Sequence, residues 1–150
     1  MFTVDTSVHV NAANPTEKDS AESRTLVEQL HGHPWPVFSP TLLLAEVAAA
    51  ISRAQNDTGQ GIIMMQAVRS LPGQIWVSLD ESLAEEAARL AAEYRLRGTD
   101  AVYAAVAQRY GTTLVTKDRQ QLERLSSAMS VLTPCEVLTR LAEMAKADKK

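Results

Sequence analysis

The segment from Gly98 to Asp118 constrains the fold of this 150-residue chain more than any other part. Residues 101–107 are small and apolar on almost every side, so they predict a helix that is buried on several faces. Thr99 is expected to cap the start of this helix, with Asp100 in its first turn. The rest of the chain is therefore expected to be arranged around this segment.

A short strand is predicted directly after this helix. Gly111 ends the helix, and residues 112–116 are rich in β-branched side chains. Asp118 follows this strand, just as Asp5 follows the apolar run at residues 1–4. Because ligands bind at the carboxyl ends of the strands in an open parallel α/β sheet, both aspartates are expected near a binding site.

Strand-like and helix-like patterns alternate along the chain, which indicates an α/β fold. We expect a three-layer α/β/α arrangement with a mainly parallel central sheet of about five strands. The expected strands cover residues 1–4, 37–38, 75–79, 112–116 and 130–132. The expected helices cover residues 17–31, 41–55, 57–70, 99–110 and 119–125, with one that begins at Ser82 and one opened by the capping box at residues 133–136.

Local chemistry predicts several boundaries between these elements. Ser39 is expected to cap the helix at residues 41–55, with Pro40 at its first position. Residues 11–16 have the composition of a turn. Residues 33–36 indicate a rigid connection, because neither of their prolines fits inside a helix.

Composition limits the classes of function. A hydrophobic content of 45% fills one core, so residues 1–145 are expected to form a single domain and the charged residues 146–150 to fray. The net charge of −3 argues against a broad basic surface for nucleic acid, but leaves open a local basic rim or binding through metal ions. Cys135 is the single cysteine, and the longest apolar run is too short to span a membrane. A cytoplasmic protein is therefore expected.

Four carboxylates stand where they can face one edge of the sheet, namely Asp5, Glu46, Asp100 and Asp118. Taken singly, an aspartate can belong to a turn or complement a helix dipole, and Glu46 can reach water or pair with Arg53. Clustered acids repel one another, which raises the pKa of at least one of them unless a divalent cation neutralises the group. Oxygen ligands of this kind suit Mg²⁺ or Mn²⁺ better than zinc.

The order of these residues resembles that in the PIN-domain nucleases. The chain resembles this family in Asp5-Thr-Ser, in Glu46 within an apolar helix, in Thr99-Asp100-Ala-Val-Tyr-Ala-Ala-Val-Ala and in Thr116-Lys-Asp118. It looks most like the bacterial and archaeal toxin ribonucleases of VapC type, from Met1 to about Pro134. After Asp118 it reads Arg-Gln-Gln-Leu rather than the Asp-Phe often found downstream in toxins, which leaves open a PIN protein that is not a toxin.

The resemblance implies a site and a reaction. Its catalytic and metal-binding residues are Asp5, Glu46, Asp100 and Asp118, with the hydroxyls of Ser7 and Thr116 in support. Members of the family bind one or two Mg²⁺ or Mn²⁺ ions at these acids and cleave RNA. Many are homodimers, and many are held inactive by a small antitoxin. The same cofactor, substrate and partners are therefore expected for this chain.

The chemistry can also be argued without the family. Hydrolysis of a phosphodiester needs a nucleophilic water and neutralisation of charge, and metal ions supply both. The three aspartates are expected to be direct or water-mediated ligands, and Glu46 to ligate the metal or orient the water. Basic residues that flank the acids are either RNA contacts or solvated surface charges: Arg95, Arg97, Lys117 and Arg119.

Two other classes of function compete with the nuclease. A non-catalytic module would use the same pocket to bind metal or RNA. A receiver or phosphatase-like domain would phosphorylate Asp5, but Ser7 stands where such enzymes usually have a second acid. His9 and the other histidines are expected in loops or on the surface, and Tyr103 in the core or an interface.

Overall fold

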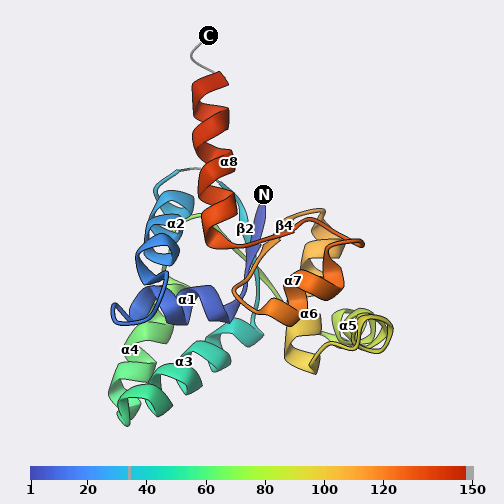
Figure 1. The fold of residues 1–150 in the computed structure, drawn as a ribbon. Helices are drawn as coiled ribbons and strands as arrows, with labels where there is room; N and C mark the ends of the chain where they lie inside the picture. Colours follow the sequence, from blue (N-terminus) through green and yellow to red (C-terminus); the bar gives the residue numbers. More distant parts are fainter. Residues whose placement is uncertain (34, 148–150) are drawn as a thin grey trace.

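A parallel five-stranded sheet lies between layers of helices, which confirms the predicted α/β/α fold (Figure 1). The computed structural model describes residues 1–33 and 35–147. The strand order is β3-β2-β1-β4-β5, with β1 Phe2–Val4, β2 Val37–Pro40, β3 Gln74–Val77, β4 Thr113–Val115 and β5 Val131–Leu132. The helices are α1 Thr6–Ala13, α2 Ser20–Gly32, α3 Leu42–Gln55, α4 Thr58–Arg69, α5 Glu81–Tyr94, α6 Gly98–Tyr110, α7 Arg119–Leu125 and α8 Pro134–Ala147.

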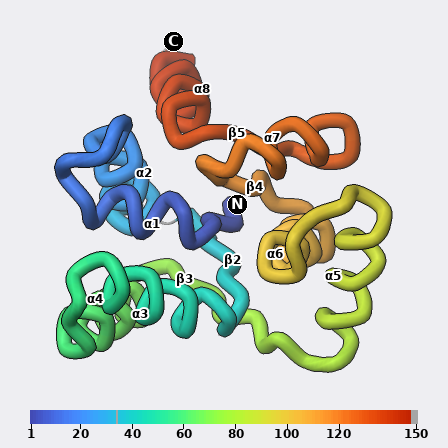
Figure 2. Tube along the Cα trace, turned by 60° about the horizontal axis from the view of Figure 1, so that its bottom comes forward, coloured from blue at the N-terminus to red at the C-terminus, as the bar shows by residue number. Residues whose placement is uncertain are grey.

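The sheet separates two hydrophobic cores. Figure 2 shows α5 and α6 on one side of the strands and α1 and α2 on the other. The larger core joins α3, α4, α5 and α6, and the smaller one packs Leu26 and Val137 of α2 and α8 against Phe2. Leu114 belongs to the first core and Val115 to the second, because successive side chains of a strand point to opposite faces.

Helix α6 is buried as predicted, since residues 101–107 are all buried and none is more than 7% exposed. Gly111 ends the helix with a φ of 61°, in the left-handed region where glycine is favoured. The predicted start was wrong, because Arg97 holds the N-cap position and Thr99 lies inside the first turn. An ion pair between Arg97 and Asp100, three residues apart, closes this turn.

The expected start of α3 at Ser39 and Pro40 was also wrong. These residues end β2, where they pair in parallel with Trp76 and Val77 of β3. The Ser39 hydroxyl donates to Gln74 Oε1 at 2.7 Å, so it is not free to cap a helix. Thr41 precedes α3 instead, and its backbone N–H bonds to Val77.

Other helix starts also differ from the prediction, and α2 begins at Ser20 rather than at residue 17. Helix α1 was not predicted; it includes residues 11–13 of the expected turn, with the polar residues His9 and Asn11 on its buried side. Because polar side chains occupy buried positions, the apolar residues of this segment do not show the spacing of an amphipathic helix. Helix α5 begins one residue before Ser82, because the Asp80 carboxylate accepts from the backbone of Leu83 at 2.9 Å.

The C-terminal helix begins with the predicted capping box. Glu136 Oε2 accepts from the Thr133 backbone at 2.7 Å, and Thr133 Oγ1 accepts from the Glu136 backbone at 3.3 Å. Helix α8 includes Lys146 and Ala147 from the segment expected to fray, and the rest of that segment lies outside the described residues, as does Pro34. None of the described helices is long and apolar enough to span a membrane.

Candidate functional site

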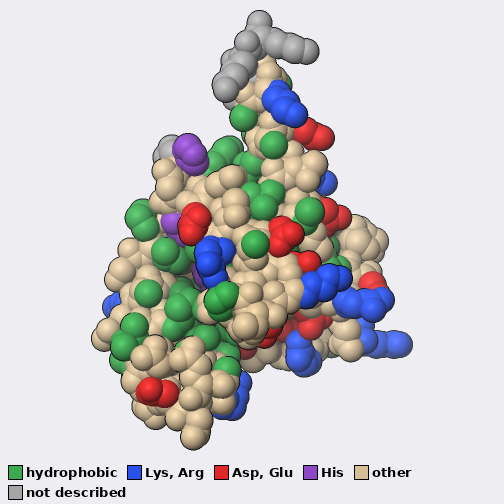
Figure 3. Space-filling view, turned by 60° about the vertical axis from the view of Figure 1, so that its left-hand side comes forward, with side chains coloured by type: hydrophobic (Ala, Val, Ile, Leu, Met, Phe, Trp, Pro, Cys, Tyr) green, Lys and Arg blue, Asp and Glu red, His purple; other side chains and the backbone are tan. Residues whose placement is uncertain are grey.

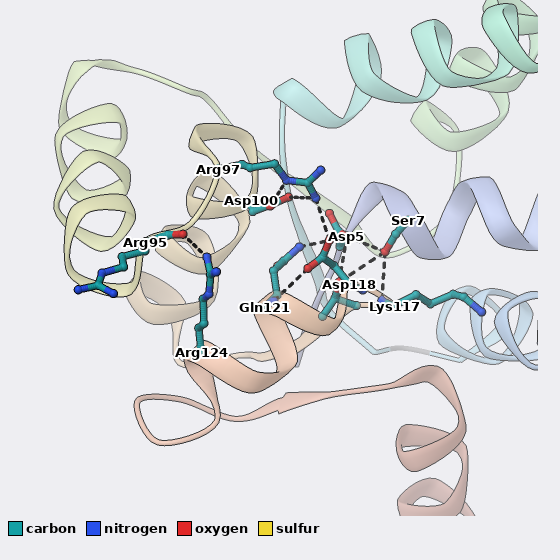
Figure 4. A network of polar contacts seen from close by, with 10 residues as sticks. Asp5, Ser7, Arg95, Arg97, Asp100, Lys117, Asp118, Gln121 and Arg124 are labelled. Atoms are coloured by element: carbon teal, nitrogen blue, oxygen red, sulfur yellow. Dashed lines mark hydrogen bonds and ion pairs between the residues drawn. The ribbon is translucent and has the colours of Figure 1, made fainter.

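The four predicted acids lie around the carboxyl edge of the central strands. β1 and β4 pair in parallel with Val4 opposite Val115, so Asp5 and Asp118 leave the sheet on the same side. Asp100 enters from the first turn of α6, and Glu46 from the second turn of α3. We call these four residues the acidic cluster (Figure 4 shows its three aspartates).

Asp5 is the most enclosed acid of the cluster, with 5% of its surface exposed. Three donors reach the same oxygen, Oδ2: Ser7 Oγ at 2.6 Å, Thr116 Oγ1 at 3.0 Å and Gln121 Nε2 at 3.4 Å. Within the described part of the chain, Oδ1 receives no hydrogen bond. The carboxylate is therefore oriented through one oxygen and offers the other to a ligand.

The two predicted supporting hydroxyls join the strand ends to the acids. Ser7 Oγ accepts from the Lys117 backbone at 3.1 Å while it donates to Asp5. Thr116 Oγ1 accepts from the Asp118 backbone at 3.0 Å and donates to Asp5. The first residues after β1 and β4 are thus connected by side chains as well as by the strand pairing.

Glu46 is oriented by two groups that sequence reasoning did not place in the site. Its Oε2 accepts from Thr6 Oγ1 at 2.7 Å and from Tyr103 Oη at 2.6 Å. The Tyr103 side chain is fully buried, and burial beside Glu46 raises the pKa of its hydroxyl. The spacing of Asp100 and Tyr103, three residues apart on α6, was the available signal, because residues i and i+3 share a helix face.

Gln121 is the other residue that the sequence did not indicate. It is fully buried in the first turn of α7, where its backbone donates to Asp118 Oδ1 at 3.0 Å and its side chain to Asp5. One residue therefore positions two acids from different strands.

Arg97 directs its guanidinium at two acids of the acidic cluster. Nε donates to Asp100 Oδ2 at 2.7 Å, and Nη2 donates to Asp118 Oδ2 at 2.8 Å (Figure 4). Its side chain is nevertheless 66% exposed, so these bonds lie at the mouth of the site.

The other three basic candidates surround the cluster without entering it. Lys117 Nζ donates to the carbonyl of Lys18 at 3.1 Å, and Arg119 lies 3.6 Å from Glu123. The Arg95 side chain points away from the acids in Figure 4, and its carbonyl accepts from Arg124.

Loss of hydration on burial, rather than repulsion between the acids, has the largest effect on the pKa values in the acidic cluster. It raises the pKa of Asp5, opposed by hydrogen bonds from Ser7 and Thr116, with smaller additions from neighbouring acids. The pKa of Asp100 is also raised by burial, against the opposing effect of Arg97. The expected rise is therefore present, but desolvation is its leading cause.

Two surface hollows lie beside the cluster. One of about 330 Å³ includes Lys117 and Arg119 in its lining, and another of about 330 Å³ includes Glu46 and Arg53. The first hollow is mixed in charge, because Asp19 and Glu22 also line it.

The donor set fits a divalent cation, although the side chains are not arranged around one. Hard cations prefer oxygen ligands, and Asp5 Oδ1 accepts no hydrogen bond from the residues that the structure describes. Among the described residues, however, no three carboxylate, histidine or cysteine side chains form a ready-made coordination group. Arg97 donates to oxygens of Asp100 and Asp118 that are part of this donor set.

Comparison with known proteins gives a family match for most of the chain. Residues 2–128 match the PIN domain family. Among curated proteins, no sequence matches the chain.

Several solved structures are similar in fold. VapC20 from Mycobacterium tuberculosis, a Sarcin-Ricin loop cleaving toxin, is 16% identical with a TM-score of 0.69, over 86% of this chain and 96% of that one. PAE2754 from Pyrobaculum aerophilum is 23% identical with a TM-score of 0.68, over 95% of both chains. A toxin-antitoxin complex from Klebsiella pneumoniae contains a chain that is 18% identical with a TM-score of 0.63, over 89% of this chain and 98% of that one.

Proposed function

This chain belongs to the PIN-domain family, and from that premise we propose that it is a Mg²⁺- or Mn²⁺-dependent endoribonuclease. PIN domains are generally nucleases, and they generally use divalent metal ions. The observation that supports the proposal most directly is the orientation of Asp5, whose three donors on one oxygen leave the other oxygen for a ligand.

Each acid has a role in this proposal. Asp5, Asp100 and Asp118 hold the cation directly or through water, and Glu46 holds it or orients the attacking water. A divalent cation in such a site neutralises charge on the phosphate and lowers the pKa of a water molecule. Thr6 and Tyr103 keep Glu46 in place, since both donate to its Oε2.

RNA is the proposed substrate, and the basic side chains around the cluster are its proposed contacts. With a net charge of −3, the chain as a whole does not attract a polyanion, so binding depends on local cations and on the metal. Those local side chains are Arg95, Arg97, Lys117 and Arg119. We propose a cytoplasmic location, because the proposed substrate is RNA.

We propose further that the protein is the toxin of a toxin-antitoxin pair and forms a homodimer. Three of the similar folds come from a toxin-antitoxin complex of Klebsiella pneumoniae and from VapBC proteins of Rickettsia felis and Salmonella typhimurium bound to DNA. Hydrophobic side chains gather on the face shown in Figure 3, and on α4 Ile62 and Ile63 are 44% and 58% exposed. A short gene directly upstream that encodes a DNA-binding protein would support the toxin assignment.

Cleavage of RNA by the purified protein tests the proposed nuclease activity. We expect the protein to cut labelled RNA with Mn²⁺ present, to stop when EDTA is added, and to leave DNA of the same sequence intact. Asp5→Asn should abolish cleavage, because an amide is a poor ligand for a hard cation and removes a negative charge.

A second substitution of aspartate by asparagine, outside the acidic cluster, serves as the control. Asp57 caps α4 by accepting from Gln60, and asparagine caps helices about as well as aspartate. Asp57→Asn should therefore cleave like the wild type. Equal activity of Asp5→Asn and the wild type, with both folded, would contradict the proposed role of Asp5.

A further inference from the structure

Arg97 occupies the oxygens that the proposed function assigns to the divalent cation. Its guanidinium contacts Asp100 Oδ2 at 2.7 Å and Asp118 Oδ2 at 2.8 Å, with a longer bond to Asp100 Oδ1 at 3.4 Å. These two acids start different elements, α6 and α7, and Arg97 is the group that bridges them (Figure 4).

The backbone of Arg97 is fixed, but its side chain can leave. The Arg97 carbonyl accepts the first hydrogen bond of α6, from Ala101 at 3.0 Å. The Arg97 side chain is 66% exposed, whereas those of Asp100 and Asp118 are 10% and 23% exposed, so the buried carboxylates need another cation when the guanidinium leaves. Rotation of the guanidinium into solvent leaves the backbone hydrogen bond between Arg97 and Ala101 in place.

A guanidinium and a divalent cation cannot use the same oxygens together. Arginine has only donors and stays charged, so it cannot join a coordination shell and repels a cation beside it. Asp5 differs from the two bridged acids, because Arg97 makes no hydrogen bond to it among the described residues. A cation at Asp5 therefore displaces no hydrogen bond of Arg97, whereas a cation that binds the same oxygens of Asp100 and Asp118 requires Arg97 to move.

We propose that Arg97 is a positioning residue that competes with the divalent cation, so that the two occupy Asp100 and Asp118 in turn. This inference rests on the proposed function and adds a property that the acids alone do not have. Without metal, Arg97 keeps the bridged carboxylates in place and limits their repulsion. The free energy needed to release the Arg97 side chain then sets the metal concentration at which the cation occupies Asp100 and Asp118.

The test is the affinity of the full-length protein for Mn²⁺ without RNA, measured by calorimetry or from the EPR signal of free Mn²⁺. Arg97→Gln should lower the dissociation constant about tenfold, which corresponds to about 1.4 kcal/mol. Arg97→Lys should lie between that variant and the wild type, because lysine keeps the charge but lacks the bidentate fork.

Arg119→Gln is the control that distinguishes competition between Arg97 and the cation from the loss of one positive charge near the site. It removes the same charge one residue from Asp118, but the Arg119 side chain is 88% exposed and pairs with Glu123 instead. We expect its Mn²⁺ dissociation constant to stay within about twofold of the wild type, since an exposed charge is screened by water and salt. Equal tightening by Arg97→Gln and Arg119→Gln would overturn the inference.

A second measurement follows the guanidinium itself. In protein labelled with ¹⁵N-arginine, titration with Mg²⁺ should shift or broaden the Arg97 Nε–H signal, because its partners are taken by the cation. The Arg109 signal is the internal reference, since Arg109 Nε donates to Glu86 at 3.1 Å, outside the acidic cluster. An Arg97 signal unchanged at saturating Mg²⁺ would contradict the exchange.

The outcomes also distinguish this inference from the proposed function. If the wild type binds Mn²⁺ and Arg97→Gln binds it equally well, the competition fails and the metal-dependent nuclease stands. If neither protein binds Mn²⁺, both proposals fail together.

Discussion

At the scale of single residues, two carboxylates of the acidic cluster are each held through one oxygen. Asp5 is held through Oδ2 and Glu46 through Oε2, by donors from other elements of the fold. A carboxylate oriented in this way keeps a defined direction for its second oxygen, which reduces the entropy lost when a ligand binds. The hydroxyl of Tyr103 is therefore as relevant to the site as the acid that it contacts.

Another buried residue affects the response of the protein to acid. His9 is 1% exposed, and its Nε2 has no hydrogen-bond partner among the described residues. Burial, with a smaller contribution from His31, lowers the pKa of His9 from 6.5 to about 4. The expectation that His9 lies in a loop or on the surface was wrong, because α1 directs it into the fold. It was also wrong for His31, which is buried in α2 with 8% of its surface exposed.

This histidine predicts a loss of stability in mild acid. Well above pH 6.5 the ring is neutral in both the folded and the unfolded state, so it adds no pH dependence there. As the pH falls from 6.5 toward 4, the unfolded chain takes up a proton and the folded chain does not, so the free energy of unfolding decreases. Between pH 7 and pH 5 the decrease from His9 is roughly 2 kcal/mol.

Urea unfolding at the two pH values measures this effect. His9→Gln should lose roughly 2 kcal/mol less than the wild type between pH 7 and pH 5, whatever its stability at pH 7. His33→Gln is the matched control, because His33 is exposed. A wild-type pH dependence in His9→Gln would show that His9 is protonated equally in both states.

At the scale of elements, the contact between α3 and α4 depends on a glycine. A Cβ placed on Gly61 would lie 2.0 Å from Ser52 Oγ and 2.5 Å from the carbonyl oxygen of Ala48. The serine side chain can rotate, but the carbonyl belongs to the backbone of α3. Gly61 weakens the helical pattern in the sequence, yet it lets the backbones of the two helices come together.

Gly61→Ala is therefore expected to destabilise the protein, although alanine favours helix formation more than glycine does. The overlap with Ala48 should cost roughly 1–3 kcal/mol, measured by thermal or urea unfolding. Gly32→Ala, at the end of α2, meets no atom within 4 Å and should be neutral or stabilising. Equal stability of the two variants would contradict the close approach of α3 and α4.

At the scale of the whole molecule, the acidic cluster links metal binding to folding. Asp5 follows β1, Asp118 follows β4, and Asp100 and Glu46 come from α6 and α3, so the site exists only when these elements are assembled. A cation bound there stabilises the folded state alone. Stability should therefore depend on metal concentration.

Thermal unfolding measures this linkage. At about a hundredfold excess of Mn²⁺ over its dissociation constant, the gain is roughly 2.7 kcal/mol, or roughly 5–10 °C in Tm for a chain of this size. EDTA should reverse the gain, and Asp5→Asn should show less of it. A rise of the same size in Asp5→Asn would assign the stabilisation to a different site.

Elements that depend on interactions between nearby residues could be predicted from the sequence. The small side chains of residues 101–107 predict a buried helix, Gly111 its end, and the Thr133–Glu136 box the start of α8, because each depends on neighbours within a few residues. The order and spacing of the four acids also indicated where a site would form, since strand ends meet at one edge of a parallel sheet.

The hydrogen bonds that hold the acids could not be predicted, because they join elements that lie far apart in the sequence. Thr6, Tyr103 and Gln121 are far in sequence from at least one acid that they contact, so no local pattern shows which distant acid each one holds. The same holds for Ser39, whose hydroxyl bonds to Gln74 across the sheet instead of capping a helix. Such partners are set by which elements pack side by side, and a one-dimensional pattern does not contain that information.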